Sequence, residues 1–195
     1  MRTLLVASGN RHKTEEIRAM LGNQFEVSDL SSHPDLPAVE ETGTTFLENA
    51  TLKAVEISEH VPGMVLSDDS GLEVDALNGA PGVYSARYAG EHANDEANNA
   101  KLLNDLNGIT ERSARFRCVI VIAEAGKVLA HFDGKVEGRI IHQGQGDGGF
   151  GYDPLFVPDG FEKSFAELGS EVKNGLSHRA RAMDQVVPWM AKNSR

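Results

Sequence analysis

The chain has 195 residues, of which 40% are hydrophobic and 25% charged, the proportions of an ordinary globular protein. A chain of this length buries roughly 70% of its unfolded surface, so it needs no disulfide or structural metal to fold. Its 29 acidic residues outnumber its 19 basic ones, for a net charge of −10, which argues against a nucleic-acid polymer or an anionic membrane as its main partner. A small anionic ligand stays open where a few cations converge.

The first part of the chain alternates strand and helix. Residues 3–7 predict a short buried strand, and a helix to about Leu21 follows, with Asn10 as its N-cap. A second strand is expected at residues 25–30 and a loop at residues 31–41. Strand, crossover helix and strand favour an α/β fold with parallel pairing.

The clearest helix spans residues 45–61, because its apolar residues recur on one stripe, with Lys53 at the edge. A short strand at residues 64–67 is expected to end in Asp68-Asp69-Ser70-Gly71. The remaining expected elements are a helix at 95–106, a hairpin of strands 115–124 and 127–132, strands at 136–141 and 155–157, and a final helix at 177–190.

The single cysteine, Cys118, begins an apolar run, so a small buried side chain is expected. The only apolar run near the start, residues 4–7, is too short for a signal peptide or a membrane span. Together they predict a reducing, cytoplasmic location.

The segment Ser8-Gly9-Asn10-Arg11-His12-Lys13 joins the first strand to the first helix. Such a turn exposes backbone N–H groups at the positive end of the helix dipole. Lys13 adds a cation where a helix normally prefers an anion. An ordinary strand-to-helix turn would explain the segment alone, but the lysine favours phosphate binding.

Two pairs of adjacent carboxylates, Glu40-Glu41 and Asp68-Asp69, lie on predicted loops. Such pairs are usually solvated, but the second follows a buried strand, where α/β folds place their ligands. Hard oxygen ligands suit Mg²⁺, which takes one or two carboxylates together with water and substrate phosphate. The two pairs together predict a metal site.

A glycine-rich loop at 144–151 leads into Phe150-Gly151-Tyr152-Asp153-Pro154. Its glycines match a dinucleotide-binding fingerprint, but no helix follows, so we exclude a Rossmann site. The loop allows a flat ligand to approach the backbone, with two aromatic rings for stacking, although a mobile hairpin tip would look the same. In Ser177-His178-Arg179, cations begin the last helix, which also indicates an anion or a carbonyl-rich ligand.

These motifs resemble, in order and over nearly the whole chain, those of the inosine/xanthosine triphosphate pyrophosphatase family. The matching blocks are Ser8-Gly9-Asn10 with Lys13, Glu40-Glu41-Thr42-Gly43, Phe46 with Glu48-Asn49-Ala50 and Lys53-Ala54, Asp68-Asp69-Ser70-Gly71-Leu72, Gly79-Ala80-Pro81-Gly82, Tyr84-Ser85-Ala86-Arg87-Tyr88, Phe150-Gly151-Tyr152-Asp153-Pro154 and Ser177-His178-Arg179. One departure is Ser8, where the family usually has threonine and where the hydroxyl is kept.

The resemblance implies one domain over 1–195 with an elongated mixed β-sheet flanked by helices and a central cleft between two lobes. It implies a cytoplasmic homodimer that hydrolyses ITP, dITP and XTP, with Mg²⁺, to monophosphate and pyrophosphate. It assigns Asp69 as general base, Lys53 to the phosphates, and Glu41 and Asp69 to the metal. The implied substrate-binding residues are Ser8, Gly9, Asn10, Arg11, His12, Lys13, Ser70, Phe150, Gly151, Tyr152, Asp153, Lys173, His178 and Arg179.

Two alternatives stay open from the residues. One is a pyrophosphatase for modified pyrimidine nucleotides, like the Maf-like proteins. The other is a non-catalytic module that binds nucleotides. A panel of substrates distinguishes the first alternative from a purine-specific enzyme. An assay for pyrophosphate release distinguishes the second from any enzyme.

Overall fold

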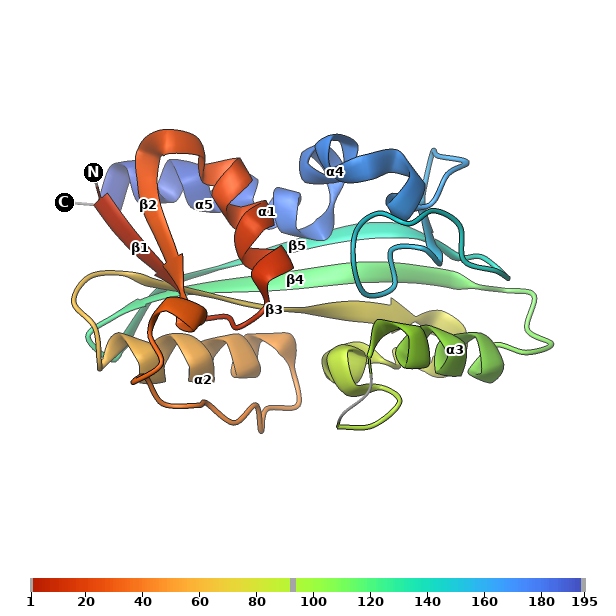
Figure 1. Ribbon diagram of the computed structural model, residues 1–195, viewed down its shortest axis with the longest axis horizontal. Coiled ribbons are helices and arrows are strands. Elements are labelled where there is room, and N and C mark those ends of the chain that lie inside the picture. The colour runs from red at the N-terminus through yellow and green to blue at the C-terminus, as the bar shows by residue number, and fades with distance from the viewer. Residues whose placement is uncertain (1, 92–93, 194–195) are drawn as a thin grey trace. The chain divides into compact units, whose positions relative to one another are not determined.

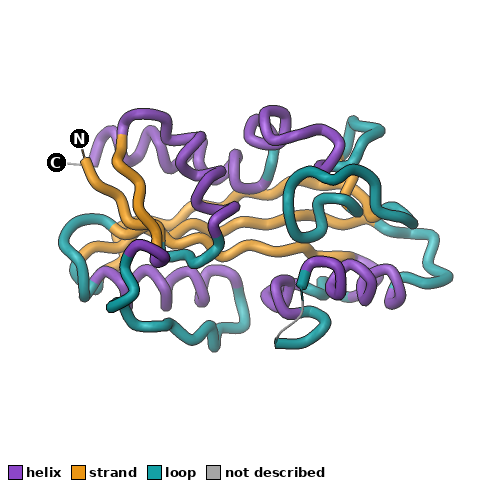
Figure 2. The backbone as a smooth tube through the Cα atoms, in the orientation of Figure 1, coloured by secondary structure: helices purple, strands orange, loops and turns teal. Residues whose placement is uncertain are grey.

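The computed structural model describes residues 2–91 and 94–193 (Figure 1). The strands are β1 (Arg2–Val6), β2 (Phe25–Asp29), β3 (Val65–Val74), β4 (Ser113–Glu124), β5 (Lys127–Ile140) and β6 (Phe156–Pro158). The α-helices are α1 (Arg11–Leu21), α2 (Phe46–Ser58), α3 (Asp95–Asp105), α4 (Phe165–Leu176) and α5 (His178–Asn193). Figure 2 shows loop over most of the segment between β2 and α2, as predicted.

The strands form one six-stranded sheet in the order β2-β1-β3-β4-β5-β6. Strand β1 pairs in parallel with β2 and, over two residues, with β3, whereas β6 pairs antiparallel with β5. The predicted α/β fold with a mixed sheet and helices is therefore confirmed. No helix among the described residues has the length and apolar character that crossing a membrane requires.

The chain divides into two compact units. Unit 1 comprises the described residues up to Asp69, residues 118–134 and the residues from Arg179 onward. Unit 2 comprises Ser70–Arg117 and Lys135–His178. Strands β3, β4 and β5 contribute residues to both units.

Both faces of the sheet in unit 1 are covered by helices. Successive strand residues point to opposite faces, so neighbouring residues of β1 belong to different apolar clusters. Leu4 and Val6 of β1 pack with α1 and α5 in one apolar cluster, while Leu5 and Ala7 pack with Ile57 of α2 in another. Figure 1 shows α2 on the opposite side of these strands from α1 and α5. Strands buried on both faces read as unbroken apolar runs, which is why residues 3–7 were recognisable as a strand.

Unit 2 has one main apolar cluster. Residues of β3, β4 and β5 pack there against Leu102 of α3, Leu106 directly after α3, and Phe165 of α4. Outward-facing residues of these strands are charged: Arg115 pairs with Asp75 at 2.8 Å and with Glu137 at 2.9 Å.

The four predicted helices are present within a few residues of their expected bounds, but three other predictions are wrong. Strand β3 does not end before Asp68-Asp69, as predicted, but continues through both to Val74. The strands predicted at 127–132 and 136–141 are one strand, β5. Helix α4 was not predicted, because glycines interrupt its sequence; Gly169, at φ 79°, kinks it.

Candidate functional site

The segment from Ser8 to Lys13 leaves the carboxyl end of β1 and starts α1. The Asn10 side chain accepts hydrogen bonds from the backbone N–H of His12 (3.0 Å) and Lys13 (3.3 Å), which confirms it as the N-cap. The Ser8 hydroxyl accepts from the N–H of Asn10 at 3.1 Å. Gly9, Asn10, Arg11 and His12 are exposed. The turn therefore presents exposed backbone at a helix N-terminus, the geometry that binds anions.

Asp68 and Asp69 are neighbours in β3, so their side chains point to opposite faces of the sheet. Asp68 faces α1 and α5, which supply Lys13 and Arg179. Asp69 faces α2, which supplies Lys53. Two carboxylates adjacent in sequence thus belong to two different charge clusters.

Asp68 is fully buried among groups that donate to it. Lys13 Nζ lies 2.7 Å from Oδ1, while Arg179 Nε and the Cys118 thiol donate to Oδ2 at 2.8 and 3.0 Å. Burial alone would raise the pKa of Asp68, but the charges of Arg179 and Lys13 outweigh it and hold this pKa well below its usual range. Arg179 also pairs with Glu16. Asp68 is therefore an ionised anchor for two cations at neutral pH.

Lys53 is the centre of the second cluster. Its Nζ lies 2.7 Å from Glu41 Oε1, 3.0 Å from the Asp68 carbonyl and 3.4 Å from Asp69 Oδ1. Burial would lower the pKa of Lys53, but Asp69 and Glu41 raise it, so the ammonium stays charged. Burial also raises the pKa of Asp69, and Lys53 only partly offsets this. A carboxylate whose pKa is raised by burial is a better base than one in water.

The loop that carries Glu41 is fixed by the start of α2. The Asn49 side-chain oxygen accepts from the N–H of Gly43 at 2.8 Å, and a Cβ at Gly43 would lie 2.7 Å from that oxygen. Thr45 and Glu48 form a reciprocal capping box at the helix start. These contacts hold Glu41 beside Lys53.

The pair Glu41 and Asp69 fits a magnesium ion that takes its other ligands from water and phosphate. The buried Asp69 Oδ2 has no hydrogen-bond partner among the described residues, and such an atom calls for an unseen water or ion. Over the same residues, no group of three or more His, Cys, Asp and Glu could hold a metal.

In unit 2, residues 150–153, here called the aromatic loop, are closed by an ion pair. Asp153 Oδ2 accepts from the Phe150 N–H at 3.0 Å and from Lys173 Nζ at 2.7 Å. Lys173 Nζ also lies 4.4 Å from the centre of the Phe150 ring, a cation–π contact. A Cβ at Gly149 would collide with the Asp153 carboxylate, so this position requires glycine.

The middle of the aromatic loop is held from two other elements. Gly151 donates its N–H to Asp95 Oδ2 at 2.6 Å and accepts from Asn99 Nδ2 at 3.0 Å. The Tyr152 hydroxyl donates to the Ser85 carbonyl at 2.7 Å, and the Tyr152 side chain is 4% exposed. Burial raises the pKa of this phenol. Tyr152 is thus a buried anchor for the loop, and Phe150 is its more accessible ring.

The remaining predicted residues lie at or beside these clusters. Ser70 follows Asp69 directly in β3 and is half-buried. His178 is 4% exposed, and its ring stacks on Phe116 at 4.9 Å. Arg179 belongs to the Asp68 cluster, so its predicted contact with a nucleobase stays a prediction. Ser177 separates α4 from α5 in an extended conformation.

A family model described as the Ham1 family matches residues 4–189. The chain belongs to the Ham1 family. It is 50% identical over 187 residues to the dITP/XTP pyrophosphatase of Geobacter sulfurreducens, covering 94% of each chain. It is 48% identical over 192 residues to that of Exiguobacterium sp., covering 96% of this chain and 98% of the relative.

Solved Ham1 structures have the same fold. The Staphylococcus aureus Ham1 protein matches with a TM-score of 0.87 at 41% identity, covering 98% of this chain and 99% of that one. A nucleoside-triphosphatase / dITP/XTP pyrophosphatase from Mycobacterium abscessus matches with a TM-score of 0.76 at 41% identity, covering 95% of this chain and 99% of that one. The family that the motifs suggested is confirmed.

Sequence reasoning missed several residues of these clusters in the Ham1 chain. Glu16, Asp95 and Asn99 were not singled out, and Cys118 was expected only as buried apolar bulk. Asp95 and Asn99 lie four residues apart, on one face of α3. This spacing was visible in the sequence, but nothing there indicated that the face would meet Gly151.

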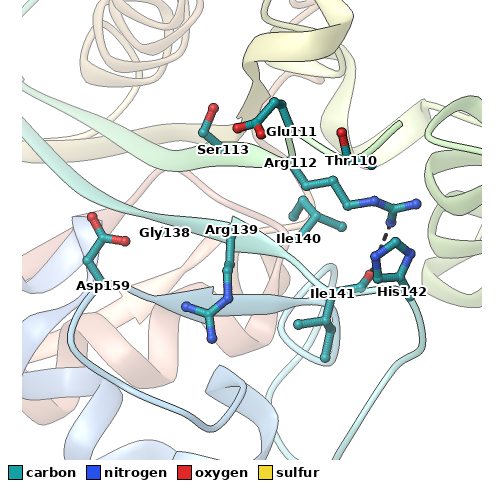
Figure 3. Close-up of a pocket in the computed structure, with 10 residues that line it drawn as sticks. All are labelled: Thr110, Glu111, Arg112, Ser113, Gly138, Arg139, Ile140, Ile141, His142 and Asp159. Carbon is teal, nitrogen blue, oxygen red and sulfur yellow. Dashed lines mark hydrogen bonds between the residues drawn. The ribbon is translucent and has the colours of Figure 1, made fainter. Parts of the chain in front are cut away.

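A separate hollow of about 410 Å³ lies within unit 2 (Figure 3). None of the predicted site residues lines it. Arg112 donates there to three backbone carbonyls, of Leu106, Ile109 and Ile141, so it serves to tie the chain together. The Arg139 and Asp159 side chains point in different directions in Figure 3, so these two charged groups do not converge in the hollow.

Proposed function

We propose that this Ham1 protein is a dITP/XTP pyrophosphatase that hydrolyses ITP, dITP and XTP to the nucleoside monophosphate and pyrophosphate. Its role would be to remove deaminated purines from the nucleotide pool. The observation that carries the proposal is the buried Asp69 carboxylate, with one unpaired oxygen, beside Lys53 and Glu41. The proteins named dITP/XTP pyrophosphatase support it because they are 48–50% identical over nearly their full length.

The exposed turn from Ser8 to Lys13 would bind the triphosphate through backbone N–H groups and the lysine ammonium. Asp69 would orient a water molecule and take its proton as the water attacks the α-phosphorus. The bond from that phosphorus to the bridging oxygen then breaks, and pyrophosphate leaves. Lys53 would stabilise the negative charge that builds up on the phosphoryl oxygens.

Glu41 and Asp69 would hold Mg²⁺, with Asp68 committed to Lys13 and Arg179. The ion would supply charge neutralisation at the phosphates when bound. Its requirement can be tested without a variant: removal of Mg²⁺ with a chelator should abolish pyrophosphate release, and re-addition should restore it.

The aromatic loop, with Lys173, His178 and Arg179, would receive the base and sugar. One face of the Phe150 ring carries the Lys173 ammonium, so a base would stack on the other face. Stacking serves every purine alike, whereas hydrogen-bond donors favour bases with a carbonyl at the purine 6-position, which adenine lacks. Inosine and xanthosine nucleotides have that carbonyl.

We also propose that residues 1–195 act as one domain, that the protein works as a homodimer, and that it resides in the cytoplasm with the free nucleotides. The family resemblance supports the dimer, and light scattering of the purified protein tests it. The family resemblance supports the proposal of a single domain, and the proposed substrate supports the cytoplasmic location.

A panel of nucleoside triphosphates with Mg²⁺, followed by pyrophosphate release, tests the function. ITP, dITP and XTP should be hydrolysed with a kcat/KM at least about 100-fold above that for ATP. Adenine would leave buried hydrogen-bond donors of the site unpaired, and such a loss can cost several powers of ten in kcat/KM. Preference for modified pyrimidine triphosphates would indicate a Maf-like activity. Binding of ITP without pyrophosphate release would indicate a non-catalytic module.

A further inference from the structure

Helix α3 fixes the aromatic loop through both polar groups of Gly151. Asp95 accepts from its N–H at 2.6 Å and Asn99 donates to its carbonyl at 3.0 Å. The two side chains, here called the α3 clamp, lie one helical turn apart. Gly151 has φ 63°, the left-handed region that favours glycine. Because glycine adopts this region and others freely, the clamp selects one of the backbone conformations open to Gly151.

Three other contacts fix the residues around Gly151. Asp153 closes the turn onto Phe150, Lys173 holds Asp153, and the Tyr152 hydroxyl binds the Ser85 carbonyl. All three act on Phe150, Tyr152 or Asp153, and the Asp153 N–H also donates to the Phe150 carbonyl at 3.2 Å. The clamp adds to this turn two bonds to the N–H and carbonyl of Gly151 itself, which lies between the accessible ring and the buried one.

The chemistry of Asn99 indicates a role beyond filling space. Its Oδ1 is buried with no hydrogen-bond partner among the described residues, and a buried unpaired polar atom is unfavourable. An apolar side chain at this position would avoid that cost but lose the bond to Gly151. Of the two polar atoms of this amide, only Nδ2 makes a favourable hydrogen bond, and that bond holds the loop at Gly151.

We propose that Asp95 and Asn99 are positioning residues for nucleobase recognition: they hold Gly151 so that the Phe150 ring lies ready to stack on the purine of the substrate. This rests on the proposed function, in which the aromatic loop receives the base. Neither residue touches the phosphates in this scheme. Loosening the clamp should therefore weaken the binding of nucleotides and leave the phosphate chemistry intact.

The test compares Asp95→Ala, Asn99→Leu and the double variant with wild type. For each single variant, KM for ITP should rise about tenfold, the usual effect of losing a hydrogen bond to a charged or well-placed partner, while kcat stays within about twofold. The inhibition constant of tripolyphosphate, which has no base, should not change. Asp95→Asn keeps an oxygen that can accept from Gly151 and should restore KM to near the wild-type value.

Glu96→Ala is the matched control for Asp95→Ala. Both acids lie in the first turn of α3 and favour the helix dipole, but the Gly151 bond belongs to Asp95. Equal KM changes in the two variants would overturn the proposal, because the effect would then come from the helix. An unchanged KM in all clamp variants would also overturn it, as would an equal loss of ITP and tripolyphosphate binding.

Calorimetric binding of ITP separates this inference from the proposed function. If wild type binds ITP but releases no pyrophosphate, the function fails, and the dissociation constants still decide whether the clamp acts on the base. If wild type binds no purine nucleotide, both fail. If Asp95→Ala proves too unstable to purify, Asn99→Leu and Asp95→Asn carry the comparison.

Discussion

The two candidate clusters are built in opposite ways. In unit 1 the candidate catalytic groups are side chains on β3, α2 and the loop before α2. Ion pairs fix them, and one oxygen of Asp69 has no partner among the described residues. In unit 2 the proposed base-binding surface is a loop. Side chains of α3 bind its backbone, Lys173 of α4 binds the Asp153 side chain, and the Tyr152 hydroxyl donates to the Ser85 carbonyl. Fixed charge suits a chemical step, whereas a held loop suits the recognition of a shape. Changes at Asp69 and Lys53 should therefore act on kcat, and changes in the aromatic loop on KM.

Asp69→Asn should have the largest effect. The amide keeps the size of the carboxylate but cannot take a proton, so kcat should fall by roughly 10²–10⁴, while the melting temperature changes little. Stopped or continuous pyrophosphate assays at saturating Mg²⁺ measure this. Near wild-type turnover in this variant would show that Asp69 is not the general base.

Asp68→Asn should act on stability. Removing one partner of a buried ion pair leaves Lys13 and Arg179 without their anchor, at a cost of about 3 kcal/mol in the free energy of unfolding. Urea unfolding measures it. Because the folded pKa of Asp68 is lowered from 3.8, its stabilisation is complete above that value and is lost as the pH falls below it. The gap between wild type and variant should thus narrow below about pH 4; a gap that stays constant would contradict this account of Asp68.

Lys53→Met tests whether the lysine acts on phosphate or only covers the core. Its apolar stem is kept, so we expect kcat to fall about 10²-fold, the typical effect of removing one charged donor at the reacting centre. Because the charge of Lys53 lowers the pKa of Asp69, the acid limb of the kcat/KM profile should also move to higher pH. Unchanged kinetics would mean that Lys53 serves only packing.

Phe150→Ala should have the smallest effect of the four and confine it to binding. Loss of a stacking face should raise KM for ITP about tenfold, since base–aromatic stacking is worth about 1–3 kcal/mol. Phe161→Ala, another half-buried phenylalanine of unit 2, is the control. A fall in kcat with KM unchanged would break the division of labour between the units.

Local signals predicted four of the five α-helices and the parallel start of the sheet, because caps and apolar stripes lie within a few residues of each other. They failed at β3, where the apolar run stops at Ser67. The strand continues because Asp68 and Asp69 find cations, and the partners Lys13 and Arg179 are 55 and 111 residues away in the chain. No periodicity reports such a pairing. The motif residues were recognisable from sequence, whereas the side chains that hold them, such as Asn99, were not.

The order of synthesis determines when unit 1 can complete its core. Its core needs Met183, Val186 and Met190 of α5, and Asp68 needs Arg179, yet these residues are made after both stretches of unit 2. During synthesis, at about 5–20 residues per second, the ribosome releases everything unit 2 requires before unit 1 can close. In a nascent chain Asp68 therefore has Lys13 as a partner but lacks Arg179 until the last helix emerges. A chain truncated before α5 would lack part of the unit 1 core, so we expect it to be degraded by proteases rather than to retain partial activity.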